Sequence, residues 1–95
     1  MGRIYSGPNR SGISTALSWG FIGNCSASVY YVKDIVALGW SRSVQSISWS
    51  GAYNCHRMTV YLRSPGGAWY SLRYCCGGTV NVTPGKEVRQ IMISA

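Results

Sequence analysis

The stretch Ile4-Tyr5-Ser6-Gly7-Pro8-Asn9-Arg10-Ser11-Gly12 has a counterpart in Val60-Tyr61-Leu62-Arg63-Ser64-Pro65-Gly66-Gly67. In each copy a short aromatic strand runs into a turn rich in Gly and Pro, which is typical of a β-hairpin. A second pair of related stretches follows, Ser43–Ser48 in the first half and Glu87–Met92 in the second. This repetition predicts two similar β units in one chain.

Apolar residues alternate with polar ones along much of the chain. The alternating runs are rich in β-branched and aromatic residues and are bounded by Gly, Pro, Asn and Ser; they cover residues 29–32, 44–49, 58–62, 69–74, 79–82 and 88–93. This pattern predicts an all-β, two-sheet sandwich. Ser28–Leu38 carries better helix formers, and we allow it at most one short helical turn before Gly39. We place the extra residues of the first half within Leu17–Leu38, on a surface loop.

The chain is short and basic. Its 95 residues suffice for a single domain, 1–95, with motif one at about 3–50 and motif two at about 57–94. Nine Lys and Arg stand against Asp34 and Glu87, which gives a net charge of +7. Such a surface favours an anionic partner. The alternative is that the charge only keeps a secreted domain soluble.

The two halves of the chain share one pattern, made of a hairpin and a later strand. The hairpins carry Tyr5 with Ser11-Gly12 and Tyr61 with Gly66-Gly67, and the later strands carry Ser46-Ile47 and Gln90-Ile91. This pattern resembles the βγ-crystallin superfamily, in which a tyrosine-led hairpin ending in glycine is paired with a later strand carrying serine before an aliphatic residue. The resemblance implies a Greek-key sandwich of two crystallin-type motifs. It also implies a hydroxyl beneath the hairpin that satisfies a backbone group left unpaired by the bend.

Many members of that superfamily bind calcium through acidic or amide residues directly before the serine strand. Ser41-Arg42 and Gly85-Lys86 occupy those places here, so the oxygen ligands that calcium needs are missing. We therefore predict no calcium, no other metal and no cofactor. Among single-domain members, Gly39–Ser48 resembles secreted killer-toxin-like antifungal proteins, whereas Gly51–Tyr61 resembles bacterial metalloprotease inhibitors.

The four cysteines, Cys25, Cys55, Cys75 and Cys76, form an even set in a short chain, which predicts two disulfides in a secreted protein. A bridge between neighbours strains the peptide, so we expect Cys75 and Cys76 to point to opposite sides of a strand and to pair separately with Cys25 and Cys55. A zinc site with His56 is the rival interpretation, but no Cys-x-x-Cys spacing supports it.

Catalysis is not expected. His56 is the single histidine, and two acids in the whole chain leave no ready partner to orient it. Binding is the better hypothesis, because arginines grip anionic groups while aromatic rings stack on sugars or bases. The candidate binding residues are Arg10, Arg42, Arg57, Arg63, Arg73, Trp19, Tyr53 and Trp69.

Three functions remain open. The first is a secreted, monomeric, antimicrobial or killer-toxin-like protein that binds an anionic cell wall or membrane. The second is a protease inhibitor that presents Gly51–Arg57 or Ser64–Trp69 as a rigid loop. Nucleic-acid binding comes last, because extracellular disulfides disfavour it.

Met1–Tyr5 lacks the apolar stretch of a signal peptide, so we expect a mature chain without its leader. If Met1 is the native start, a cytosolic location returns and the disulfide argument weakens.

Overall fold

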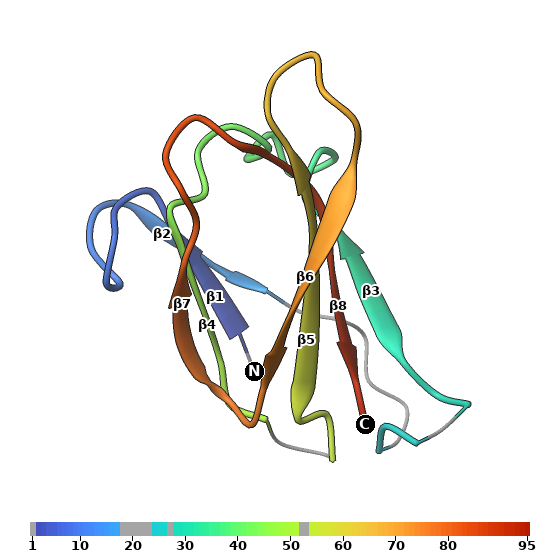
Figure 1. The fold of residues 1–95 in the computed structure, drawn as a ribbon. Helices are drawn as coiled ribbons and strands as arrows, with labels where there is room; N and C mark the ends of the chain where they lie inside the picture. Colours follow the sequence, from blue (N-terminus) through green and yellow to red (C-terminus); the bar gives the residue numbers. More distant parts are fainter. Residues whose placement is uncertain (1, 18–23, 27, 52–53) are drawn as a thin grey trace.

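The computed structural model describes residues 2–17, 24–26, 28–51 and 54–95. These residues form eight strands in two antiparallel four-stranded sheets that face each other (Figure 1). No helix occurs in this part of the chain. The predicted all-β, two-sheet sandwich is confirmed.

Each sheet mixes strands from both halves of the chain. The first sheet has the order β2 (Ser14–Leu17), β1 (Gly2–Tyr5), β4 (Ser46–Trp49) and β7 (Gly78–Asn81). The second sheet has the order β3 (Tyr31–Asp34), β8 (Glu87–Ser94), β5 (Arg57–Arg63) and β6 (Tyr70–Cys75). Each half therefore keeps three strands together and gives its third strand, β3 or β7, to the other sheet.

The pairing registers of the two halves correspond. Ile4 of β1 lies opposite Ile47 of β4, and in the second sheet Val60 of β5 lies opposite Ile91 of β8. All four side chains are buried between the sheets. The repeat in the sequence therefore reappears as a repeat in strand order and in core positions.

The core lies between the sheets because one side of each strand is apolar. Full burial of one large aliphatic side chain contributes roughly 1.5–3 kcal/mol, so this layer supplies most of the driving force for folding. Its buried members are Ile4, Leu17, Cys25, Ile35, Val44, Ile47, Trp49, Cys55, Met58, Val60, Leu62, Val82, Val88, Ile91 and Ile93.

The first hairpin folds over its own sheet. Asn9 and Arg10 have φ angles of 53° and 61°, a region that side chains other than glycine seldom adopt. The buried Ser46 hydroxyl donates to the Gly7 carbonyl at 2.7 Å and accepts from the Arg10 N–H at 3.0 Å. A hydroxyl therefore lies beneath the bend of the first hairpin, the arrangement that the resemblance implies.

The second hairpin has a different loop. Gln90 stands where Ser46 stands in the first half, and the loop closes on itself through the Gly67 N–H, which donates to the Ser64 carbonyl at 2.8 Å. This β5–β6 loop extends beyond the end of the sheet in Figure 1.

The predicted disulfide pairing is wrong. Cys25 bonds to Cys55, with Cα atoms 5.1 Å apart, and Cys75 bonds to Cys76. The prediction assumed that both neighbours continue a strand, but β6 ends at Cys75 and Cys76 has a φ of 81°. The chain turns there, and the Cys76 N–H donates to the His56 carbonyl. The two side chains therefore do not alternate across a strand.

The segment that the sequence allowed a helical turn forms β3 and a tight turn. The Asp34 carboxylate accepts from the Val36 and Ala37 N–H groups at 2.9 and 3.2 Å, and the Gly39 N–H donates to the Val36 carbonyl at 3.0 Å. In the part of the chain that the structure describes, no helix has the length and hydropathy needed to cross a membrane.

Candidate functional site

The outer face of the second sheet gathers cationic side chains from three strands. On β5, Met58, Val60 and Leu62 point into the core, so Arg57 and Arg63 point outward. The alternation that builds the core therefore also places these guanidinium groups on the opposite side of the sheet.

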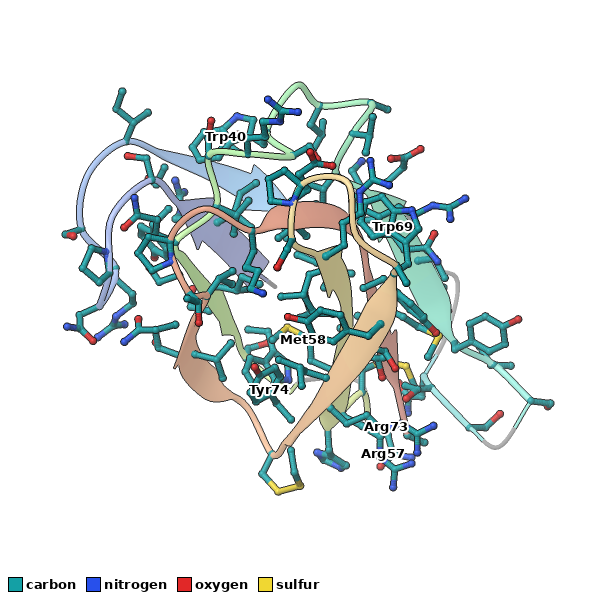
Figure 2. The ribbon with its side chains drawn as sticks, turned by 45° about the horizontal axis from the view of Figure 1, so that its top comes forward. Trp40, Arg57, Met58, Trp69, Arg73 and Tyr74 are labelled. Carbon is teal, nitrogen blue, oxygen red and sulfur yellow. A yellow bond between two sulfur atoms is a disulfide. The ribbon has the colours of Figure 1, made fainter. Side chains whose placement is uncertain are left out.

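The neighbouring strand β6 adds Arg73. In the register, Arg73 lies opposite Thr59 and Arg57 lies opposite Cys75, so the two arginines are diagonal neighbours on one face. Figure 2 shows both side chains projecting from the same end of the sheet. Both are exposed.

Trp69 marks the other end of this face. The guanidinium carbons of Arg63 and Arg89 lie 4.4 and 5.7 Å from the centre of its ring. Both distances are within the range of a cation–π interaction. We call the set Arg57, Arg63, Arg73, Arg89 and Trp69 the arginine face.

Glu87 neutralises part of the charge beside this face. Its carboxylate accepts from Arg42 and Arg63 at 2.9 Å each, and its side chain is only 8% exposed. The hydrogen bond from Arg63 lowers the pKa of Glu87; burial opposes this shift and Arg42 adds to it. Arg42 comes from the β3–β4 loop and Arg63 from the end of β5. The two ion pairs therefore connect the start of β8 to both of these segments.

The remaining charge has no carboxylate partner. Within the described ranges the ion pairs involve Arg42 and Arg63 alone, and Asp34 is engaged by backbone N–H groups. Arg57, Arg73 and Arg89 therefore present their charge to solvent. Such a face attracts anions over about one Debye length, roughly 8–10 Å in physiological salt.

The inner side of the same sheet carries tyrosine side chains that are not part of the arginine face. Tyr74 packs against the core. Burial raises its pKa, and the nearby Tyr70 phenol adds to the shift. On the outer side, the buried Thr59 hydroxyl lies between Arg73 and Met92 in the register and has no hydrogen-bond partner among the described residues.

The structure brings together half of the predicted binding residues. Arg57, Arg63, Arg73 and Trp69 share the arginine face, and Arg42 reaches its rim through Glu87. Arg10 lies in the β1–β2 loop, which belongs to the other sheet. The two remaining candidates, Trp19 and Tyr53, lie outside the described residues, as does part of the predicted loop Gly51–Arg57.

Arg89 was missed by the sequence reasoning. It lies where the β5–β8 register shifts, between Tyr61 and Leu62 on the facing strand. A bulge of this kind breaks the alternation from which sidedness is read. Its position beside Trp69 therefore follows only from the assembled sheet.

No cluster of three or more His, Cys, Asp or Glu that would hold a metal ion is present in the described part of the chain. At the places expected for calcium ligands in a crystallin-like motif, Arg42 bonds to Glu87 and Lys86 donates to the Ser64 hydroxyl at 2.6 Å. His56 is exposed, and its Nε2 lies 2.9 Å from the Asn54 side-chain oxygen. The expected lack of calcium and of catalysis stays a prediction.

No protein-family model, no curated protein and no solved structure matches the chain.

Proposed function

We propose that this protein is a secreted, basic defence protein of antimicrobial or killer-toxin-like type that docks on an anionic cell-surface polymer through the arginine face. The observation that carries the proposal is that Arg57, Arg73 and Arg89 share the outer face of one sheet, and none of them is paired with a carboxylate among the described residues. Trp69 lies on the same face, against Arg89.

The shape of the face favours a polymer over a small molecule. Arg57 and Arg63 stand at the two ends of β5, about 20 Å apart at about 3.3 Å per residue. Guanidinium groups bind phosphate and carboxylate in a bidentate manner, and the indole face stacks on sugar rings. A row of such groups along a strand matches anionic groups that repeat along a chain.

Binding to purified bacterial and fungal walls at increasing salt tests the proposal. We expect the double variant Arg57→Gln/Arg73→Gln to bind about thirtyfold more weakly, because each cation near an anionic surface contributes about 1 kcal/mol. The matched control, Lys33→Gln/Lys86→Gln, removes the same charge outside the arginine face and should bind almost as tightly as the parent protein.

Equal losses in the two double variants would show that net charge alone is responsible and would refute the arginine face. Binding that does not weaken with salt would refute electrostatic docking. Growth inhibition measured with the same proteins tests the defence role: inhibition should follow wall binding across the variants. Vesicles of anionic lipid and duplex DNA serve as competitors, and stronger binding to either would redirect the proposal.

The protease-inhibitor hypothesis has one observation in its favour. The loop Ser64–Trp69 extends beyond the sheet, and its base is held by the Arg63 bond to Glu87. Incubation with metalloproteases and serine proteases decides it. Slow cleavage with stoichiometric inhibition supports a false substrate, whereas rapid cleavage at this loop without inhibition removes the idea.

We also propose a distant relationship to the βγ-crystallin superfamily. Two observations support it: the correspondence of the two halves in strand order and core register, and the Ser46 hydroxyl beneath the first hairpin. Neither observation bears on the docking target, because function resides in sites and not in the fold.

A further inference from the structure

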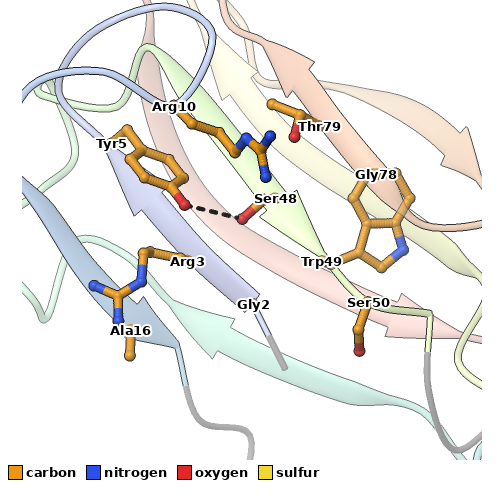
Figure 3. A pocket seen from close by; sticks show the side chains of 10 residues that line it. All are labelled: Gly2, Arg3, Tyr5, Arg10, Ala16, Ser48, Trp49, Ser50, Gly78 and Thr79. Carbon is orange, nitrogen blue, oxygen red and sulfur yellow. Dashed lines mark hydrogen bonds between the residues drawn. The ribbon is translucent and has the colours of Figure 1, made fainter.

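A hollow of about 420 Å³ lies on the outer face of the first sheet, on β1, β2, β4 and β7 (Figure 3). Its polar and aromatic lining comes from Arg3, Tyr5, Arg10, Ser48, Trp49 and Thr79. This sheet is the one opposite to the arginine face, so the hollow is separate from the docking surface proposed above.

The hollow exists because several surrounding positions carry little or no side chain. Gly2 and Gly78 stand at the ends of β1 and β7, and Ala16 lies opposite Arg3 on β2. A Cβ atom at Gly78 would meet nothing within 4 Å. These small residues therefore leave open space on the sheet beside the Arg3 and Arg10 side chains.

Arg10 occupies this space at a cost to the backbone. Its φ of 61° favours glycine, yet a long cationic side chain is present. The conformation is held in place, because the Arg10 N–H donates to Ser46 and the Asn9 N–H donates to the Asn81 side chain at 2.9 Å. Figure 3 shows the Arg10 guanidinium directed toward Ser48.

Hydroxyl groups complete the lining. The Tyr5 and Ser48 hydroxyls lie 3.4 Å apart, and Thr79 faces Ser48 across the β4–β7 pair. None of the lining residues is acidic. Guanidinium groups bind the oxygens of phosphate and other oxyanions, whereas hydroxyls that both donate and accept suit the hydroxyls of a sugar.

We propose that this hollow binds a single saccharide unit that carries a phosphate or sulfate group. The oxyanion lies at the Arg10 guanidinium with Arg3 at the rim, and the sugar hydroxyls meet Tyr5, Ser48 and Thr79. The volume falls within the roughly 300–1,000 Å³ of small-molecule sites. The inference goes beyond docking on a polymer, because it assigns a discrete ligand to the opposite sheet.

Titration with three probes, followed through backbone amide NMR signals, tests the ligand class. Glucose 6-phosphate should shift the signals of Ser48 and Thr79 at millimolar concentration, inorganic phosphate should bind more weakly, and glucose more weakly still. The absence of any shift with glucose 6-phosphate would overturn the site. Equal affinity for inorganic phosphate and glucose 6-phosphate would overturn the role of the hydroxyls.

The variant Arg10→Gly separates binding from folding, because glycine suits the positive φ and keeps the N–H that Ser46 accepts. We expect a melting temperature equal to or above that of the parent protein, with at least about tenfold weaker binding of glucose 6-phosphate. Lys33→Gln removes one positive charge elsewhere and should leave the affinity unchanged. Undiminished binding by Arg10→Gly, or an equal loss in both variants, would refute the assignment.

Tyr5→Phe is a second test of the site, since it removes a hydroxyl while the ring remains. It should weaken binding of glucose 6-phosphate and leave binding of inorganic phosphate as before. An equal effect on both probes would contradict the placement of the sugar.

Discussion

Replacing Ser46 with alanine removes the buried side chain that bonds two backbone groups of the first hairpin to the sheet beneath it. The hydroxyl is buried, donates to the Gly7 carbonyl at 2.7 Å and accepts from the Arg10 N–H at 3.0 Å. The change leaves both backbone groups without this partner and creates almost no cavity, so the lost hydrogen bonds dominate its effect.

The size of the effect follows from these two bonds. Each contributes about 0.5–1.5 kcal/mol net, and a buried partner left unsatisfied costs more. The hairpin groups are only partly buried, so water compensates in part. We expect the free energy of unfolding to fall by about 2 kcal/mol, which for a domain of this size lowers the melting temperature by roughly 8–16 °C.

Thermal and urea unfolding, monitored by near-ultraviolet circular dichroism, measure the change. Ser48→Ala is the matched control: it is on the same strand, but within the described ranges its hydroxyl makes a single long contact, 3.4 Å, with Tyr5. We expect it to cost no more than about 0.5 kcal/mol. If both variants melt at the same temperature, Ser46 does not secure the hairpin and our account of the bend is wrong.

The other stability predictions address the ion pairs, the disulfides and the core. The pKa of Glu87 is lowered in the folded state, chiefly by its hydrogen bond from Arg63, so its contribution is present above the unfolded pKa and is lost as pH falls through the folded pKa. Acid titration of the melting temperature should therefore show a loss below about pH 4 that Glu87→Gln lacks. Cys25→Ala/Cys55→Ala opens a bridge that spans 30 positions and should cost about 3–4 kcal/mol in urea unfolding, whereas Cys75→Ser/Cys76→Ser opens a bridge between neighbours and should cost less than about 1 kcal/mol. Ile47→Ala, in the core, should cost about 2–5 kcal/mol, against about 0.5 kcal/mol or less for the exposed Ile13→Ala; similar losses at both positions would contradict the assigned core.

Much of the fold could be predicted from the sequence because it depends on local rules. Alternation at Met58, Val60 and Leu62 gives a strand with one apolar side, and the shared hairpin pattern indicates a repeat. The pairing of the cysteines could not be predicted in this way. Alternation alone would allow the strand to include Cys76. The positive φ angle of Cys76 instead ends β6 at Cys75, and this decides the pairing.

The candidate site was less accessible to prediction, because the sheet to which a strand belongs is decided by the whole topology. Arg57, Arg63 and Arg73 lie on neighbouring strands of one hairpin and so share a face. Arg10 comes from a similar hairpin in the first half, but that hairpin belongs to the other sheet. No pattern of residue types distinguishes these two placements.

The exchange of β3 and β7 has a consequence for how such a molecule can arise. One half alone holds three paired strands and a fourth strand that finds no partner within the same half. Two copies of that half would complete each other. The unpaired strand of each copy would pair with the edge strand of the other copy that corresponds to β4 or β8, as β7 and β3 do here. A gene encoding only one unit would thus yield a symmetric dimer, and joining two such units end to end would convert an assembly that dissociates on dilution into one that cannot.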